Sequence, residues 1–416
     1  MKTKLLTVSV AMALAMAATS ASAVNFTGYV RSGVGVSKDG ATQSWMIPYV
    51  GRLGNEADTY SEVGLGQEVY NKGGTSFYVD SMFAMSSNGS NDWEATSGSD
   101  ANFALVQFNV QAKGLIAASK DAVVWAGKRY YQRHDLHVID SKYWNISGAG
   151  AGVENFQAGP GTISAAVIRS DASIGGTTGA LNVNYLDLRY AGFKPWEGAW
   201  TEFGVDYALK NATDAQDTAT TNFKNSLMLT AEISQFFAST SINEKLVGQY
   251  FTKALAHNAI DQGGGWYDVW SGDNSDAKGY RFINNGELPY GKFVLNYVLT
   301  YGRADDYDST HAVDNTKLLS LVGRAQYQWT DITKSIFEAG TFTKKTTYTS
   351  GSDWKDSGQK FTVAQAWSAG PGFWARPEIR VYATYLKDGG DGDNKSFNGK
   401  TDDNTMNYGV QAEAWW

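Results

Sequence analysis

The sequence predicts an all-β fold, a transmembrane antiparallel β-barrel with roughly 16 to 18 strands. Strand-like runs of about 8 to 12 residues with alternating polarity recur along the chain between turn-rich stretches. After the N-terminal segment there is no run of about 18 apolar residues, so the sequence offers no transmembrane helix. The 416 residues include 45 glycines, 23 tyrosines and 14 tryptophans but only 6 prolines, a balance typical of barrels with aromatic girdles.

The first residues have the pattern of a secretory signal peptide. Lys2 and Lys4 supply positive charge, residues 5–17 are mostly apolar, and Ala21-Ser22-Ala23 matches a cleavage site. We therefore expect residues 1–23 to be removed on export and residues 24–416 to form one barrel domain in the bacterial outer membrane. The chain contains no cysteine, so the exported fold is expected to be stable without disulfides.

The expected strands follow one another without a linker or a low-complexity stretch. The segment 71–74 is typical of a short periplasmic turn, whereas 86–101, 346–358 and 387–403 are typical of long outer loops. The clearest predicted strands are Phe26–Val36, Thr59–Tyr70, Phe77–Ala84, Phe103–Ala112, Thr162–Arg169, Glu202–Leu209, Lys292–Arg303, Leu318–Tyr327, Glu378–Leu386 and Tyr408–Trp416.

Alternation along the last strand assigns its two faces, because successive side chains point to opposite sides of a sheet. From Tyr408 to Trp416 the even positions are apolar or aromatic. The odd positions include Gln411, Glu413 and Trp415. We therefore expect Trp415 to lie on the polar, inward face beside a charged residue.

Three further segments show the same pairing of an aromatic ring with a charge on the inward face. The pairs are Tyr29 with Arg31, Tyr60 with Glu62, and Trp374 with the inward series Arg376, Glu378 and Arg380, provided that Pro377 introduces no bulge. A pyranose has apolar C–H faces that stack on rings and an edge of hydroxyls that bonds to charged groups. A row of such pairs predicts a pore in which an oligosaccharide slides between weak, similar sites.

The chain also resembles a known family in a series of motifs. These are Gly28-Tyr29-x-Arg31-Ser32-Gly33, Arg52-Leu53-Gly54-Asn55-Glu56, Leu65-Gly66-Gln67-Glu68-Val69, Asn91-Asp92-Trp93-Glu94-Ala95-Thr96, Trp125-Ala126-Gly127-Lys128-Arg129, the stretch from Tyr131 to Asp140, Tyr143-Trp144, and Trp415-Trp416 at the end. The match is dense over 24–155 and firm again near the C-terminus. By these motifs residues 24–416 resemble the maltoporins, outer-membrane channels for maltose and maltodextrins.

The resemblance implies an 18-stranded barrel that assembles as a homotrimer in the outer-membrane lipid, with one sugar channel per subunit. It implies an aromatic slide made of Trp93, Tyr60, Tyr29, Trp415 and Trp374, with Trp93 reaching into the pore of a neighbouring subunit. It also implies polar tracks made of Arg31, Arg52, Glu62, Arg133, Asp135 and Asp140.

The sequence departs from the family pattern at three positions. Val106 or Gln107 stands where a track arginine is expected, and Lys142 stands at the constriction where a tyrosine is usual. The sixth slide aromatic, a phenylalanine, aligns near Asn243 and has no clear equivalent. These departures leave open a preference for another oligosaccharide such as sucrose.

Other functional classes are less consistent with the sequence. A net charge of −7 argues against nucleic acid. His134 and His137, with Asp135 and Asp140, resemble a metal or acid–base cluster, but a strand places residues three apart on opposite faces. Paired carboxylates also suit a glycoside hydrolase, although a membrane-type last strand does not. A general diffusion porin would share the barrel without the inward rings. We expect passive transport, with no enzymatic activity, cofactor or metal.

Overall fold

The structure, a computed structural model, describes residues 23–38, 40–98, 100–173, 179–217, 223–391, 397 and 403–416. The predicted signal peptide therefore lies outside the described residues except for Ala23. Within the described ranges, twenty strands form one sheet. Two of them, β2 (Gly40–Ala41) and β11 (Ala172–Ser173), have only two residues each, which leaves 18 strands in the wall.

The wall strands are joined in chain order, each antiparallel to the next. Their bounds are β1 (Asn25–Ser37), β3 (Thr59–Lys72), β4 (Thr75–Ser87), β5 (Ala101–Lys113), β6 (Val123–Arg129), β9 (Gly148–Ala158), β10 (Gly161–Arg169), β12 (Ala180–Phe193), β13 (Ala199–Asn211), β14 (Ser226–Phe237), β15 (Ile242–Thr252), β16 (Lys278–Tyr290), β17 (Phe293–Asp305), β18 (Val313–Gln328), β19 (Thr333–Tyr348), β20 (Asp353–Ser368), β21 (Glu378–Asp388) and β22 (Asn404–Trp415).

Short elements fill the connections. These are β7 (His134–Leu136) and β8 (Ser141–Trp144), which pair only with each other, the helices α2 (Ile47–Val50) and α3 (Asn258–Asp261), and the 3₁₀ turns η1 (Thr96–Gly98), η2 (His137–Ile139) and η4 (Lys253–Leu255). Among the described residues, no helix is long and apolar enough to cross a membrane.

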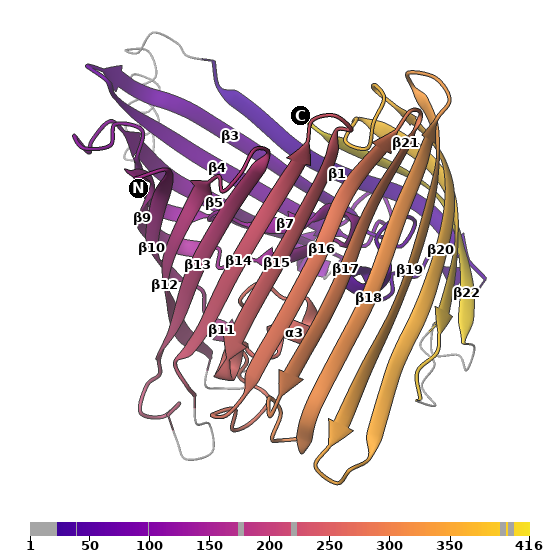
Figure 1. Ribbon diagram of the computed structural model, residues 1–416. Coiled ribbons are helices and arrows are strands. Elements are labelled where there is room, and N and C mark those ends of the chain that lie inside the picture. Colours follow the sequence, from indigo (N-terminus) through magenta and orange to yellow (C-terminus); the bar gives the residue numbers. More distant parts are fainter. Residues whose placement is uncertain are drawn as a thin grey trace.

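The sheet closes on itself because β1 pairs with β3 on one side and with β22 on the other. Across the closing pair, Tyr29 lies opposite Trp415 and Arg31 lies opposite Glu413. Figure 1 shows the tilted strands curving around an interior, with the C-terminus at the rim of the barrel. The predicted barrel and its 18 strands are confirmed.

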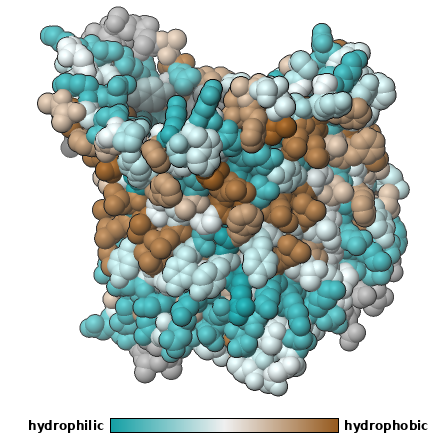
Figure 2. Space-filling view, in the orientation of Figure 1, coloured by the Kyte–Doolittle hydropathy of each residue, from teal (hydrophilic) through white to brown (hydrophobic). Residues whose placement is uncertain are grey.

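The outer face of the wall is apolar, as the alternation predicts. Val34 of β1 is 74% exposed, and Val363 of β20 and Val410 of β22 are exposed on the same face. Figure 2 shows hydrophobic residues gathered across the middle of the visible face, with hydrophilic residues below them. Exposed aromatic rings such as Tyr290, Phe293, Trp329 and Trp367 lie near strand ends, where they form the girdle of a membrane barrel.

All ten predicted strands are present, but one predicted loop is wrong. Residues 346–358 were expected to form a long outer loop, whereas β19 and β20 run through them and leave a turn of only four residues, 349–352. The pairs Thr346–Trp354 and Lys344–Asp356 continue the ladder. Apart from Tyr348 and Trp354, both faces of this extension are polar, so the apolar alternation that identifies a strand is absent. The predicted loop 387–403 lies mostly outside the described residues.

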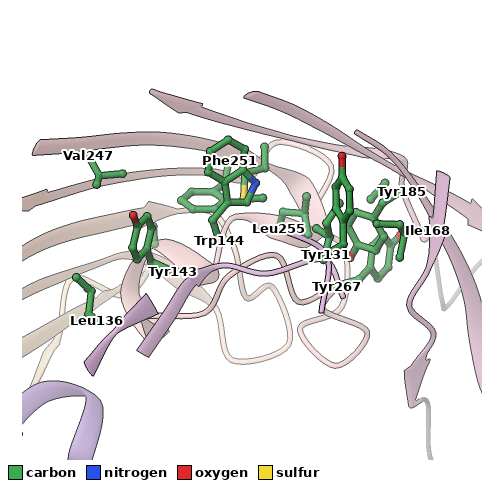
Figure 3. Packing of buried hydrophobic residues seen from close by; sticks show 14 of the residues in the cluster. Tyr131, Leu136, Tyr143, Trp144, Ile168, Tyr185, Val247, Phe251, Leu255 and Tyr267 are labelled. Carbon is green, nitrogen blue, oxygen red and sulfur yellow. The ribbon is translucent and has the colours of Figure 1, made fainter. Parts of the chain in front are cut away.

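The connection between β6 and β9, residues 130–147, folds into the barrel; we call it the inner segment. The Tyr143 hydroxyl donates to Glu232 of β14 at 2.7 Å, and Trp144 Nε1 donates to Asp206 of β13 at 2.8 Å. Gly204 makes room for the indole, because a Cβ there would lie 2.1 Å from Trp144 Cζ2. Figure 3 shows Tyr143 and Trp144 packed beside wall residues of the largest buried apolar cluster.

A second connection, between β1 and β3, also folds inward at α2. The backbone N–H of Arg52 donates to the carbonyl of Val138 at 3.1 Å, which ties this connection to the inner segment. The N–H of Leu53 donates to the Glu338 carboxylate of β19 at 2.9 Å. Both inward connections are thus held to the wall and to each other, and together they narrow the lumen.

Candidate functional site

The site is a lumen cavity of about 490 Å³ near the seam between the first and last strands. Its walls contain every predicted site residue except Trp93, together with His137, which the prediction left out. The lining residues are Tyr29, Arg31, Arg52, Tyr60, Glu62, Arg133, Asp135, His137, Asp140, Lys142, Trp374 and Trp415.

Four aromatic rings form a row along one side of this cavity. The rings of Tyr29 and Trp415 stack, with centroids 6.5 Å apart and planes 16° apart. Tyr60 lies 6.1 Å from Tyr29 on one side, and Trp374 lies 6.3 Å from Trp415 on the other. The order Tyr60, Tyr29, Trp415 follows from strand alternation and from the pairing of β3, β1 and β22.

Trp374 joins the row from a different position than the one predicted. It was expected on a strand with Arg376 and Glu378, but β21 begins only at Glu378, and residues 369–377 form the connection that precedes it. The guanidinium of Arg376 bonds to the carbonyl of Phe373 at 3.1 Å and to Glu413 at 2.7 Å. Buried Phe373 and this bridge turn the connection inward, which brings the Trp374 ring to the end of the row.

Arg52 is the polar hub behind the row. Its Nη2 lies 2.6 Å from the Tyr29 hydroxyl, 2.8 Å from Glu56 Oε2 and 3.1 Å from Glu413 Oε1. The side chain is buried, and burial lowers the pKa of the guanidinium. The charges of Glu56 and Glu413 outweigh that effect and hold the pKa of Arg52 well above its ordinary value. Arg52 is therefore a permanent cation that fixes the Tyr29 hydroxyl.

The other end of the row carries a second set of polar groups. Arg31 pairs with Asp58, with Nη2 2.9 Å from Oδ2, and its guanidinium lies over the Tyr60 ring at 5.1 Å. The Tyr60 hydroxyl donates to Glu62 at 2.7 Å. Tyr130 donates to the same carboxylate at 3.2 Å, a contact that was not predicted from the sequence. Aromatic rings and charged groups therefore alternate at this end of the row, as they do along the sequence.

The inner segment also lines the cavity, with Arg133, Asp135, His137, Asp140 and Lys142. Arg133 stacks on the Tyr130 ring, with its guanidinium carbon 4.0 Å from the centroid. Asp140 adopts a left-handed backbone with φ of 49° and forms an ion pair with Lys142. Burial raises the pKa of the Asp140 carboxyl, but Lys142 and Arg52 outweigh it and hold the pKa below its ordinary value. Lys142 thus faces the lumen as half of an ion pair.

His137 supports the aromatic row from behind. Its ring meets Trp415 edge-on at 5.6 Å and lies 5.3 Å from Trp374, and its Nδ1 lies 3.0 Å from Arg52 Nη1. Burial and then Arg52 lower the pKa of His137 well below its ordinary value. A neutral imidazole can accept the Arg52 N–H. The spacing of three residues between His134 and His137 did not predict this role. The chain leaves strand geometry at η2, which begins at His137.

The suggested cluster of His134 with His137, Asp135 and Asp140 does not form. His134 lies instead with Glu202 and Glu232, and the ligand atoms of these three residues lie within 4.8 Å of one another. Lys245 is 3.4 Å from Glu232, and Arg189 is 3.8 Å from Glu202, so cations already offset both carboxylates. His137 contacts the aromatic row, whereas His134 contacts the wall strands.

Trp93 is the one predicted site residue outside the cavity. It lies in the connection between β4 and β5, where Asn91 Oδ1 accepts its backbone N–H at 2.9 Å. Its side chain is 84% exposed. Within this chain, Trp93 therefore projects from the barrel and does not join the row.

Solved structures with a similar fold include the outer-membrane protein OpdK. OccAB2 of Acinetobacter baumannii matches with a TM-score of 0.53 and 11% identity over 94% of this chain and 97% of its own. OpdK of Pseudomonas aeruginosa matches with a TM-score of 0.51 and 12% identity over 95% of this chain and 99% of its own. At this identity the likeness shows the barrel fold and nothing finer.

The relatives found by sequence comparison are much more similar to this chain than these solved structures are. Maltoporin 1 of Aeromonas salmonicida is 61% identical, and Maltoporin 2 of Yersinia pestis is 54% identical, each over the whole of both chains. The family described as LamB porin matches residues 24–416. The resemblance stated from the motifs is confirmed, and the chain belongs to the LamB porin family.

Proposed function

We propose that this chain is a passive outer-membrane channel for maltose and maltodextrins. The observation that supports this most is the row Tyr60, Tyr29, Trp415 and Trp374 in a lumen cavity flanked by charged groups. Full-length relatives named maltoporins support the same substrate class. The channel transports the sugar passively, and the sugar gradient sets the direction of transport.

The row offers a sugar a continuous set of equivalent surfaces. Neighbouring centroids lie 6.1 to 6.5 Å apart, so a glucose unit that leaves one ring meets the next without a gap. The hydroxyl edge of the sugar faces the inner segment, where Arg133, Asp135 and Asp140 supply donors and acceptors. Each contact is modest, and permeation requires sites that hold a solute without trapping it.

The charged groups are set for binding before sugar arrives. Arg52 is held by Glu56 and Glu413, and Arg31 is held by Asp58. Because these side chains are already fixed, a bound sugar has little side-chain ordering to impose. This arrangement favours fast binding and release over tight binding, as a channel requires.

We further propose that the protein works as a homotrimer in which Trp93 begins the track of a neighbouring subunit. Its 84% exposure and its absence from the lining of its own chain's cavity support this role. The girdle rings at the strand ends support a place in the outer-membrane lipid.

The test is single-channel conductance in a planar lipid bilayer, with maltohexaose added in steps and sucrose as the comparison sugar. A maltodextrin channel gives ion current that maltohexaose blocks saturably, in three equal steps for a trimer. Sucrose block that equals or exceeds maltohexaose block identifies a porin for another sugar. Current that neither sugar blocks identifies a diffusion porin, and either result refutes the proposal.

A further inference from the structure

Cations on four neighbouring strands stand side by side on the outer face of the barrel. Arg303 of β17 lies directly opposite Lys317 of β18, and Lys317 lies directly opposite Lys345 of β19. Lys345 in turn lies opposite Lys355 of β20. We call these four residues the cation row. Each belongs to the outward series of its strand, which continues through the exposed side chains of Tyr301, Leu319, Phe337 and Phe361.

The cation row lies where the apolar outer wall ends, at the rim that carries the long connections. β17 runs in the same direction as β1, so Arg303 lies near the rim from which the connection 38–58 leaves. The opposite rim carries short turns such as 291–292. In Figure 1 the arrowheads of β17 and β19 lie at the lower rim, and Figure 2 shows hydrophilic residues gathered there below the hydrophobic band. Barrels of this kind have short periplasmic turns and longer outer loops, so the row faces the outer leaflet.

The charges of the row are only partly offset within the chain. Arg303 Nε lies 2.7 Å from Asp305 Oδ1, and Lys345 Nζ lies 2.7 Å from Asp353 Oδ2. Among the described residues, Lys317 between them forms no ion pair. Like charges directly opposite each other on one face destabilise a sheet. The whole chain has a net charge of −7, so this local excess of cations indicates an anionic partner.

An apolar groove of about 480 Å³ opens in the outer wall beside the row. Its floor is open at Gly248, where a Cβ would meet nothing within 4 Å. The rings of Tyr250 and Tyr280 lie 5.2 Å apart, and Tyr280 lies directly opposite Arg303, so the groove extends to the level of the row. The outward residues that line it are Leu229, Gly248, Tyr250, Tyr280, Phe282 and Tyr301. The groove and the row together suit an amphiphile with an anionic head and acyl chains.

We propose that the cation row and the groove bind the phosphorylated glycolipid of the outer leaflet, lipopolysaccharide. Its phosphate groups lie against the opposed cations, and one of its acyl chains lies in the groove. Neighbouring strands are about 4.8 Å apart, so the cations of two strands reach one phosphate. Hydrogen bonds from Lys and Arg to phosphate are of the stronger, charge-assisted kind. The site lies outside the pore and does not depend on the sugar that the channel carries.

The experiment measures lipid binding to the folded protein in detergent, with native mass spectrometry to count the bound lipid molecules. The probes are diphosphoryl lipid A, lipid A without its phosphates, and phosphatidylglycerol. The test variant is the double substitution Lys317→Gln with Lys345→Gln. The matched control, Lys72→Gln with Lys292→Gln, removes two exposed cations at the opposite rim. Ion conductance in a planar bilayer checks that each variant forms an open barrel.

We expect the wild type and the control to bind diphosphoryl lipid A about tenfold more tightly than the dephosphorylated form or phosphatidylglycerol. The test variant should lose this preference. Gly248→Leu fills the floor of the groove and should weaken both forms of lipid A by the same factor.

Thermal unfolding gives a second readout with a change of sign. Without lipid, Lys317→Gln should raise the unfolding midpoint, because it removes two opposed like-charge pairs. With diphosphoryl lipid A at saturation, the same variant should have a lower midpoint than the wild type, because it stabilises the bound phosphate less.

Three results would overturn the site. One is equal binding of phosphorylated and dephosphorylated lipid A by the wild type. Another is an equal loss of affinity in the test variant and the control, which indicates general charge attraction. The third is phosphatidylglycerol binding as tight as that of diphosphoryl lipid A, which indicates a surface for any anionic lipid. None of these results changes the block of the pore by maltohexaose, so failure of the site is distinct from failure of the proposed function.

Discussion

The rings of Tyr29 and Trp415 stack 6.5 Å apart with planes 16° apart, although they come from the first and last strands of the chain. Their register as directly opposed residues fixes this geometry. Arg52 then fixes the tilt of Tyr29 through its hydroxyl, and Arg376 lies over the Trp415 ring at 4.3 Å. The centre of the track is therefore rigid, and substitutions there should have predictable effects on sugar binding.

Removing the centre of the row should weaken sugar binding without harming the barrel. Trp415→Ala deletes a stacking surface, and stacking of this kind contributes about 1–3 kcal/mol. We expect maltohexaose to bind about tenfold more weakly in single-channel titrations. Tyr408→Ala, on the outer face of the same strand, is the control and should leave the affinity unchanged. Equal affinities for Trp415→Ala and the wild type would remove Trp415 from the track.

Trp93 should act on capture of the sugar. Because its side chain is exposed and does not line the cavity, Trp93→Ala is expected to slow association of maltohexaose from the outer side about threefold or more. Dissociation and ion conductance should stay close to wild-type values. Trp367→Ala removes another exposed indole, at a strand end of the outer face, and should have no effect on association. A pure change in the dissociation rate would contradict the assigned position of Trp93.

The depressed pKa of His137 predicts how stability depends on pH. Burial and Arg52 disfavour its protonation in the folded barrel, whereas the unfolded chain takes up a proton near pH 6.5. As pH falls below about 6.5, the contribution of His137 to the free energy of unfolding should drop by about 1.4 kcal/mol per pH unit until its folded state is protonated.

This dependence is measured by urea unfolding of the lipid-embedded barrel between pH 8 and pH 5. His137→Gln should reduce the slope, whereas His311→Gln, on an exposed loop, should keep it. Maltohexaose affinity of the wild type should stay constant from pH 8 to pH 7, where His137 is neutral. An identical pH slope in all three proteins would show that His137 is not the responsible group.

Lys142 should set the charge selectivity of the pore. Its ammonium pairs with Asp140 beside the cavity, and Lys142→Gln removes this ion-pair partner and one positive charge from the lumen. We expect the reversal potential in a potassium chloride gradient to shift toward cation selectivity. Lys113→Gln removes an exposed cation at the end of β5, outside the cavity, and should not shift it. Lys142→Tyr should also strengthen maltohexaose binding, because it adds a flat wall opposite the row.

Gly204 should be indispensable for the inner segment. A Cβ at this position would lie 2.1 Å from Trp144 Cζ2, so Gly204→Ala forces the indole out of its place. Overpacking of this kind destabilises a fold by about 1–3 kcal/mol. We expect a lower midpoint in urea unfolding and an altered single-channel conductance. Gly248→Ala, whose Cβ meets nothing within 4 Å, is the matched control and should behave as the wild type.

Much of the wall was predictable because strand alternation and membrane burial leave a clear signal. The inward parity of Tyr29, Tyr60 and Trp415 was read directly from that alternation and is confirmed by the cavity they line. This alternation disappears where both faces of a strand contact water. For that reason the extension of β19 and β20 through 346–358 was mistaken for a loop.

The inner parts of the site could not be derived from periodicity. The inner segment has no regular alternation, and its course depends on contacts with remote residues such as Glu232 and Asp206. The inward direction of Trp374 was predicted from strand alternation, and the direction is correct. The reason is different, because the connection before β21 brings the ring inward. Arg52, Arg133, Asp135 and Asp140 came from the family resemblance alone, and His137 was noticed only as part of a metal cluster that does not form.

The seam between β1 and β22 has a consequence for biogenesis. Half of the aromatic row comes from the first strands of the chain and half from its last residues, and the two halves become neighbours only when the seam closes. A nascent or truncated chain therefore has rings but no track. Retention on an immobilised maltodextrin would report completed closure, so sugar binding can separate finished barrels from stalled assembly intermediates.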